Sequence, residues 1–386
     1  MATARQRRPA LLSALGAALL IAAPLVAQDK PAPQVPWKDS FFPYLTSSSN
    51  DFPMIALKFV YFRPADYFAR VANAAIFGAE VGSTFNGSRR AVVRFDAPLV
   101  WPGWRLSAAA AAVRQARFGF YGLGNDAPYD KALVTDTSKY YYRAHRTRYL
   151  ARAELTRQIV GHLSAALLGG VEQSRLSSAP GPSVFAQTIG TEVDETDVIG
   201  RLAVVFDTRD KEYDPQNGLF VEGSVLRGSG GDGYTRFTGI ARGYVSIREG
   251  TVLAARLAGS GIDGSPPLSA RFDLPSWETT QSILGGAATN RGLPYERYAG
   301  TGVLIGSAEI RHDILDAGDF GAITAIGFVD AGRVFEGEPF TFTTKGLKVG
   351  GGLGLGIRVL RSSIFTLNFA GGPEGFRFST GTGWAF

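Results

Sequence analysis

Apolar and polar residues alternate with a period of two along most of the chain after residue 27, and a helical period is absent there. In 348–359, large apolar residues such as Val349 and Leu353 occupy one face, while glycines fill most of the other. The last such segment, 376–386, ends on the aromatic residue Phe386. Sixteen segments follow this pattern: 42–48, 53–63, 70–85, 89–98, 104–120, 139–157, 160–174, 198–209, 218–228, 235–247, 252–262, 302–313, 319–335, 347–360, 363–371 and 376–386.

Segments of about ten residues with one large apolar face and one small or polar face are typical of strands that cross a membrane. A soluble β-sandwich would instead carry charge on its exposed face. Short connections alternate with long ones, and the even strand number lets both chain ends lie on the periplasmic side. The pattern therefore predicts an all-β fold, a transmembrane antiparallel β-barrel of sixteen strands over residues 41–386.

The first 27 residues have the order of a secretory signal. Three arginines precede an apolar stretch at 9–25, and small residues then lead into a polar segment. We expect cleavage near Ala27, and the alternative is an uncleaved N-terminal membrane anchor. Residues 28–40 are rich in proline and too short for a folded domain, so we expect a short periplasmic segment there.

The composition argues against several kinds of site, partner and membrane span. The 386 residues are 45% hydrophobic and include three histidines and no cysteine, which excludes a disulfide scaffold and a cysteine-ligated zinc site. The net charge is +6, but without residues 1–27 the chain has 37 basic and 34 acidic residues, which gives no reason to expect nucleic acid as a partner. After residue 27, no apolar stretch is long enough for a transmembrane helix.

Enzyme signatures are absent from the sequence. It contains no Gly-x-Ser-x-Gly elbow, no phosphate-binding P-loop and no His-Glu-x-x-His zinc motif. The glycine-rich stretch 350–356 lacks the third glycine and the following helix of a dinucleotide-binding fingerprint. We therefore expect that the protein is not an enzyme and has no catalytic residue, cofactor or metal site.

Four stretches occur in a recognisable order along the chain. Residues 120–130 read FYGLGNDAPYD, 204–225 contain a charged turn between two strands, 283–314 contain the pair Arg291-Gly292, and 327–335 read GFVDAGRVF. In this order they resemble the BamA/TamA-like superfamily, also called the bacterial surface antigen family. The resemblance implies a short member of a group of sixteen-stranded barrels of the bacterial outer membrane that insert or translocate proteins.

In the family that this chain resembles, the sixth extracellular loop folds back into the lumen, and an Arg-Gly pair at its tip contacts the barrel wall. The resemblance places this tip at Arg291-Gly292, with Glu309 and Asp330 on the next two strands as its partners. Alternation points Glu309 to the lumen, and a carboxylate of Asp330 facing lipid would be costly. One guanidinium can bridge two carboxylates with directed donors. The alternative is a solvated Arg291 and two carboxylates that only line the lumen.

The resemblance also implies a seam between the first and last strands. A weakly paired seam could open sideways and pair with an incoming strand by β-augmentation. Gly381 and Gly383 in the last strand agree with weak pairing. Trp384 and Phe386 form the expected C-terminal strand signal, and the turn Asp207-Thr208-Arg209-Asp210 is expected to be structural.

The best-known members of the family carry repeated periplasmic domains before the barrel, whereas only 28–40 separate the expected signal from the first strand here. We therefore expect a separate periplasmic partner, exported or outer-membrane client proteins, and outer-membrane lipid as partners. The alternative function is a passive or gated pore, or a structural barrel, for solutes or lipid.

Overall fold

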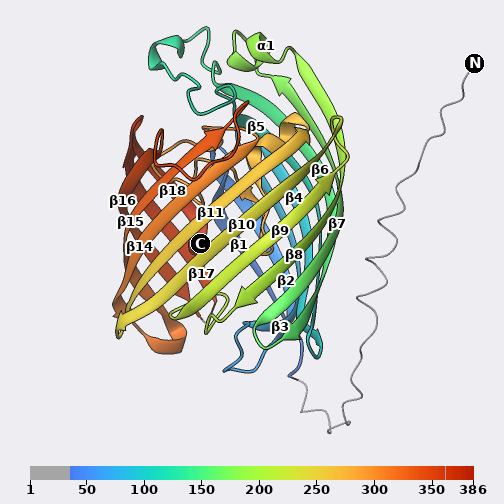
Figure 1. The fold of residues 1–386 in the computed structure, drawn as a ribbon. Coiled ribbons are helices and arrows are strands. Elements are labelled where there is room, and N and C mark those ends of the chain that lie inside the picture. The colour runs from blue at the N-terminus through green and yellow to red at the C-terminus, as the bar shows by residue number, and fades with distance from the viewer. Residues whose placement is uncertain (1–34, 361) are drawn as a thin grey trace, which may run out of the picture. The chain divides into compact units, whose positions relative to one another are not determined.

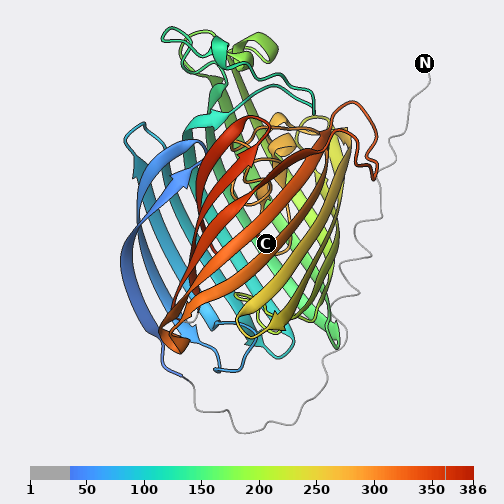
Figure 2. The same ribbon diagram turned by 90° about the vertical axis from the view of Figure 1, so that its left-hand side faces the viewer.

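The structure is a computed structural model, and it describes residues 35–360 and 362–386. Within Trp37–Phe386, sixteen strands form one antiparallel sheet that curls into a nearly closed barrel (Figures 1 and 2). The prediction of an all-β barrel of sixteen strands is confirmed. The expected signal at 1–27 lies outside the described residues, as does most of the expected periplasmic segment at 28–40.

The strands of the barrel follow one another around the sheet in chain order. They are β1 (Lys38–Ser48), β2 (Asp51–Pro64), β3 (Asn73–Thr84), β4 (Arg89–Trp101), β5 (Trp104–Gly119), β6 (Arg143–Val160), β7 (Leu163–Ser178), β8 (Glu192–Asp207), β9 (Gly218–Gly228), β10 (Gly233–Arg248), β11 (Thr251–Ser265), β14 (Gly302–Asp316), β15 (Gly321–Phe335), β16 (Lys348–Val359), β17 (Ser363–Gly372) and β18 (Gly375–Thr382).

The remaining elements are short. Two-residue strands β12 (Asp273–Leu274) and β13 (Gln281–Ser282) pair within the connection between β11 and β14. The helical turns are α1 (Val184–Thr188), η1 (Lys131–Leu133), η2 (Leu268–Phe272) and η3 (Gly318–Phe320). None of the helices in the described part of the chain has the length and apolar character needed to span a membrane.

Each predicted segment corresponds to one strand, with ends that shift by a few residues. The eighth strand begins at Glu192 rather than at 198. Its extra residues are mostly acidic or polar and pair with the polar end of β7, so Ser177 lies opposite Glu192. Hydrophobic alternation does not detect such an extension, because it follows only the apolar part of a strand.

Strand β9 shows how the sequence produces two different barrel surfaces. Leu219, Val221 and Val225 are exposed on the outer face, while Phe220 and Glu222 between them are buried toward the lumen. Successive side chains of a strand point to opposite faces, so an apolar outer surface and a polar inner one arise from a single alternating sequence.

The connection between β11 and β14, residues 266–301, packs against the inner wall of the barrel. Its side chains Leu284, Leu293 and Tyr298 belong to one buried cluster together with Ile305 of β14 and Val334 of β15. Burial of apolar side chains stabilises this segment in the lumen, although it has little regular secondary structure.

The sheet begins at β1 and ends at β18, and no ladder joins these two strands among the described residues. With eight residues, β18 is the shortest strand of the barrel. The rings of Phe52, at the start of β2, and Phe378 of β18 meet edge to face near this boundary, with their centroids 6.5 Å apart. The barrel therefore has a seam between β1 and β18, at which the described backbones are not paired.

The chain leaves β18 after Thr382, so the predicted strand 376–386 is wrong for its last four residues. Gly383 has a φ of 89°, a left-handed conformation that turns the chain. Trp384 and Phe386 then pack in two buried clusters with residues of other strands. The C-terminus accordingly lies within the outline of the barrel in both views (Figures 1 and 2).

Candidate functional site

Arg291 of the 266–301 loop is buried against β14 and β15. Its guanidinium donates from Nε to Asp330 Oδ2 (2.8 Å) and from Nη2 to Asp330 Oδ1 (2.9 Å). Its backbone N–H donates to the same carboxylate at 3.0 Å, and Nη1 donates to Glu309 Oε1 at 2.5 Å. The guanidinium carbon lies 3.5 Å from the ring centroid of Phe328. The three charged side chains thus form one buried group.

Gly292 lies against glycines of the barrel wall. A Cβ atom at Gly292 would lie 2.8 Å from the Gly350 Cα and 2.8 Å from the Gly371 carbonyl oxygen. Beside it, the Asn290 side chain donates to the Lys348 carbonyl oxygen at 2.9 Å. The loop backbone therefore packs directly against the glycine face of β16. This close approach requires glycine both in the loop and in the wall.

Glu309 is shared between two arginines. Its Oε1 accepts from Arg291, and its Oε2 accepts from Arg311 Nε at 2.8 Å. Arg311 also donates to the Phe386 carbonyl oxygen at 3.1 Å, and its guanidinium lies 4.6 Å from the centroid of a Trp384 ring. A continuous set of contacts therefore runs from the loop to the two aromatic residues that follow β18.

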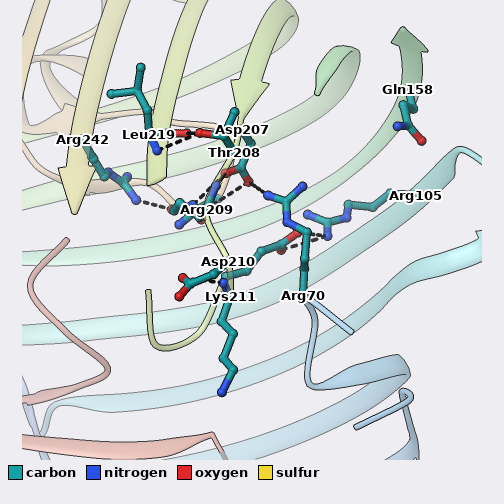
Figure 3. Close-up of polar contacts among 12 residues, drawn as sticks. Arg70, Arg105, Gln158, Asp207, Thr208, Arg209, Asp210, Lys211, Leu219 and Arg242 are labelled. Carbon is teal, nitrogen blue, oxygen red and sulfur yellow. Dashed lines mark hydrogen bonds and ion pairs between the residues drawn. The ribbon is translucent and has the colours of Figure 1, made fainter. Parts of the chain in front are cut away.

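A second anchor of the loop, which the sequence analysis missed, involves the turn after β8. Glu278 accepts hydrogen bonds from Arg209 at 2.7 Å and from Arg242. Asp207 holds Arg209 through its Nε at 3.0 Å and also pairs with Arg70 (Figure 3). Burial by itself would raise the pKa of Glu278, but the two guanidiniums outweigh it and lower the pKa to about 2.

A third contact joins the loop to the first hairpin. Glu296 Oε2 accepts from Asn50 Nδ2 at 3.2 Å, from the Gly119 N–H at 3.3 Å and from the Ser49 hydroxyl. Burial raises the pKa of Glu296 to about 7, and the hydrogen bonds from Ser49 and Gly119 oppose that rise. Since Ser49 and Asn50 form the turn between β1 and β2, the loop contacts the hairpin that borders the seam.

Asp273, at the first residue of β12, supplies a fourth contact. Its carboxylate accepts from Arg148 at 2.9 Å and from Arg146 at 3.4 Å, both on β6. The sequence nevertheless contains a signal for these anchors. Arginines recur at inward positions of the wall, and the 266–301 loop carries carboxylates at Asp273, Glu278 and Glu296.

These contacts are suited to holding a segment in place. Removal of one partner of a buried ion pair leaves an uncompensated charge, so such a pair resists separation. In the part of the chain that the structure describes, no group of three or more His, Asp or Glu side chains is arranged to hold a metal ion. The site is therefore a set of contacts that anchor the 266–301 loop to the inner wall of the barrel.

The model of the Omp85 superfamily domain matches residues 101–384, which is most of the chain. The chain belongs to the Omp85 superfamily. The predicted membership in a BamA/TamA-like group of barrels is confirmed. The protein is accordingly a bacterial outer-membrane protein, as predicted.

Solved structures give the same picture of the fold. This Omp85 chain is similar to BamA from Haemophilus ducreyi lacking POTRA domains 1-3, with a TM-score of 0.56 and 12% identity over 91% of this chain and 70% of that one. It is also similar to CdiB from Acinetobacter baumannii, with a TM-score of 0.51 and 11% identity over 89% of this chain and 65% of that one. For CdiB from Escherichia coli the TM-score is 0.56, with 10% identity over 91% of this chain and 63% of that one.

These identities are low, so the likeness concerns the fold alone. The chain spans less than two thirds of the length of both CdiB structures. Among curated proteins, none matches this sequence.

Proposed function

We propose that this Omp85 barrel inserts or translocates proteins through the seam between β1 and β18. The observation that carries the proposal is that the sheet ends at these two strands without a ladder between them in the described residues. An unpaired strand edge presents backbone donors and acceptors to a further strand. A client segment would therefore add to this edge by backbone hydrogen bonds.

In this proposal the 266–301 loop braces both sides of the seam. On one side, Glu296 contacts the turn between β1 and β2. On the other side, Arg291 of the loop shares the carboxylate of Glu309 with Arg311 of β14. Arg311 in turn contacts Trp384 and Phe386, which follow β18. Movement of the loop would change the support of both edges, so the loop is suited to control when the seam opens.

The Arg291-Gly292 tip, with Glu309 and Asp330, is the set of positioning residues for this loop in the proposal. We also propose that Trp384 and Phe386 act as the C-terminal signal for assembly of the chain itself. Residues 1–27 would direct export and be cleaved. Most of the 28–40 segment, up to the start of β1 at Lys38, would lie in the periplasm. Recruitment of clients would then depend on a separate periplasmic partner.

A cross-link across the seam tests the proposal directly. The chain contains no cysteine, so two introduced thiols react alone. Phe52→Cys with Phe378→Cys places them at rings that are in contact, and both positions are about half exposed. A cleavable bifunctional thiol reagent should abolish client assembly in cells, and cleavage of the reagent should restore it.

The matched control joins two strands that are already paired. Phe369 and Phe378 lie opposite each other on β17 and β18, with ring centroids 5.1 Å apart. Cross-linking of Phe369→Cys with Phe378→Cys should leave client assembly unchanged. Equal activity of the cross-linked seam and the cross-linked control would contradict opening at the seam.

Depletion of the protein in its host, followed by quantification of the outer-membrane proteome, identifies the class of client. A joint fall of many barrels supports insertion, and a fall of one exported protein supports dedicated translocation. An unchanged proteome with altered permeability to solutes or lipid would instead support a gated or passive pore.

A further inference from the structure

We propose that a cavity between the 266–301 loop and the inner wall binds a small organic phosphate. The cavity has a volume of about 460 Å³, which is within the range of small-molecule sites. Five arginines line it: Arg94, Arg146, Arg148, Arg152 and Arg236. The proposal concerns a ligand of the lumen and does not depend on the proposed function at the seam.

The carboxylates that line the cavity have donors of their own. They are Glu172, Asp197, Asp273 and Glu296. Glu172 and Asp273 pair with Arg148 at 2.5 and 2.9 Å. Asp197 accepts from the Tyr234 hydroxyl at 2.7 Å, and Glu296 accepts from neutral donors. The acidic side of the cavity is therefore satisfied.

Two arginines of the basic side are not paired with a carboxylate. Arg94 is exposed and has no hydrogen-bond or ion-pair partner among the residues that the structure describes, and Arg152 donates to the Thr280 hydroxyl at 3.0 Å. Arg94 lies opposite Ala109 across β4 and β5, and Ala109 lies opposite Arg152 across β5 and β6. The two guanidiniums thus extend from one row of the wall and repel each other.

Small residues in the same row keep space in front of these guanidiniums. Ala109 separates Arg94 from Arg152, and Gly170 lies opposite Arg152 on β7. Both small residues line the cavity together with the arginines. The row therefore provides two positive charges and room for a ligand between the wall and the loop.

Four residues that line the cavity also carry a buried donor without a partner. The Nε atoms of Arg146, Arg148 and Arg236 and the Ser282 hydroxyl are buried and make no hydrogen bond within the described chain. Arg146 and Arg236 are each 3% exposed. Buried polar groups without partners are costly, so an acceptor that reaches these donors after a movement of the side chains would be bound favourably.

A phosphate monoester fits both observations. It carries nearly two negative charges near neutral pH and three terminal acceptor oxygens, and planar guanidiniums bind such oxygens through directed pairs of hydrogen bonds. The volume exceeds what a bare ion requires, so the geometry favours phosphate attached to a small polar group such as glycerol or a sugar.

Isothermal titration calorimetry on the full barrel in detergent tests the site, with glycerol 3-phosphate as the probe and inorganic phosphate as the bare ion. We expect saturable binding of one glycerol 3-phosphate per chain and weaker binding of inorganic phosphate. Arg94→Gln should weaken binding by about tenfold or more. Since Arg94 has no partner in the described chain, this variant should retain the folded barrel, which heat-modifiable migration on a gel verifies.

Arg175→Gln is the matched control, because Arg175 is 57% exposed and pairs with Glu192 away from the cavity. It should bind with unchanged affinity. Tighter binding of dihexanoyl phosphatidic acid than of glycerol 3-phosphate, lost in Arg94→Gln, would support the site and identify a lipid headgroup as the source. No saturable binding of any probe, or equal affinity in Arg94→Gln, would overturn the proposal, whatever the seam cross-link shows.

Discussion

Arg291 and Asp330 form a bidentate ion pair inside the barrel, and the Arg291 backbone N–H adds a third hydrogen bond to the same carboxylate. Each residue is 2% exposed. The pair joins a loop to a wall strand 39 positions later in the chain. Since both charges have been removed from water, each depends on the other for its compensation.

Substitution of Arg291 should therefore destabilise the barrel strongly. We expect Arg291→Ala to lower the free energy of unfolding by about 3–5 kcal/mol, because Asp330 would remain buried without its partner. Arg291→Lys should recover little of this loss, since an ammonium does not reproduce the two parallel hydrogen bonds. The midpoint of heat-modifiable migration measures the change.

A double-mutant cycle isolates the pair. The Arg291→Ala/Asp330→Asn variant should be less destabilised than the sum of its two single variants, because the unpaired charge is removed. Strict additivity of the two substitutions would show that the contact contributes nothing beyond its separate residues.

Gly292→Ala should displace the loop tip. The new Cβ would meet backbone atoms of Gly350 and Gly371 at 2.8 Å, and backbone atoms of paired strands yield little. We expect a cost of about 1–3 kcal/mol, together with faster cleavage of the loop by an arginine-specific protease added to the folded barrel. Gly306→Ala is the control, since a Cβ there meets nothing within 4 Å. Similar cleavage rates in the two variants would exclude a tight seat for Gly292.

Glu296 should make the anchoring of the loop sensitive to pH. Its pKa is raised from the ordinary value of 4.5 to about 7 in the folded chain, mainly by burial. The protonated form is thus favoured by folding, and this stabilisation is complete below pH 4.5 and lost as the pH rises through 7. Thermal unfolding should therefore show a loss on the order of 1–3 kcal/mol between pH 5 and pH 8.

Glu296→Gln imitates the protonated side chain and should remove this dependence while keeping the loop in place. Glu192→Gln, at an exposed ion pair, should retain the pH profile of the unaltered protein. An identical slope in Glu296→Gln would assign the pH dependence to another group.

The strands could be predicted because each of them needs an apolar face toward the lipid and can carry polar residues on its inner face. In β9, Val221 and Val225 must face outward while Glu222 must face inward, so the sequence itself alternates. The family resemblance predicts the pairing of Arg291 with Glu309 and Asp330, and the alternation of the two strands places both carboxylates on the inward face. The alternating pattern alone does not specify which loop residue reaches them.

Other features had no such signal. Alternation continues through Trp384 and Phe386, yet Gly383 turns the chain away from the strand, and spacing does not reveal where a strand ends. The contact of Glu278 with Arg209 joins residues 69 positions apart. Such a contact depends on the path of a long loop through the lumen, which no local pattern encodes.

The Glu278 anchor leads to a last prediction, in which the pH dependence has the opposite sign. Its pKa is lowered from 4.5 to about 2 in the folded chain, so its ionised form contributes stability above pH 4.5, and that contribution is lost as the pH falls toward 2. Glu278→Gln should lower the free energy of unfolding at pH 7 by about 1–3 kcal/mol and reduce the additional loss in acid. Arg242→Gln should give a similar acid profile, because it removes one of the two guanidiniums that hold the same carboxylate. Unfolding midpoints followed from pH 7 to pH 2 provide the measurement, and full acid sensitivity in Glu278→Gln would assign the loss of stability in acid to another group.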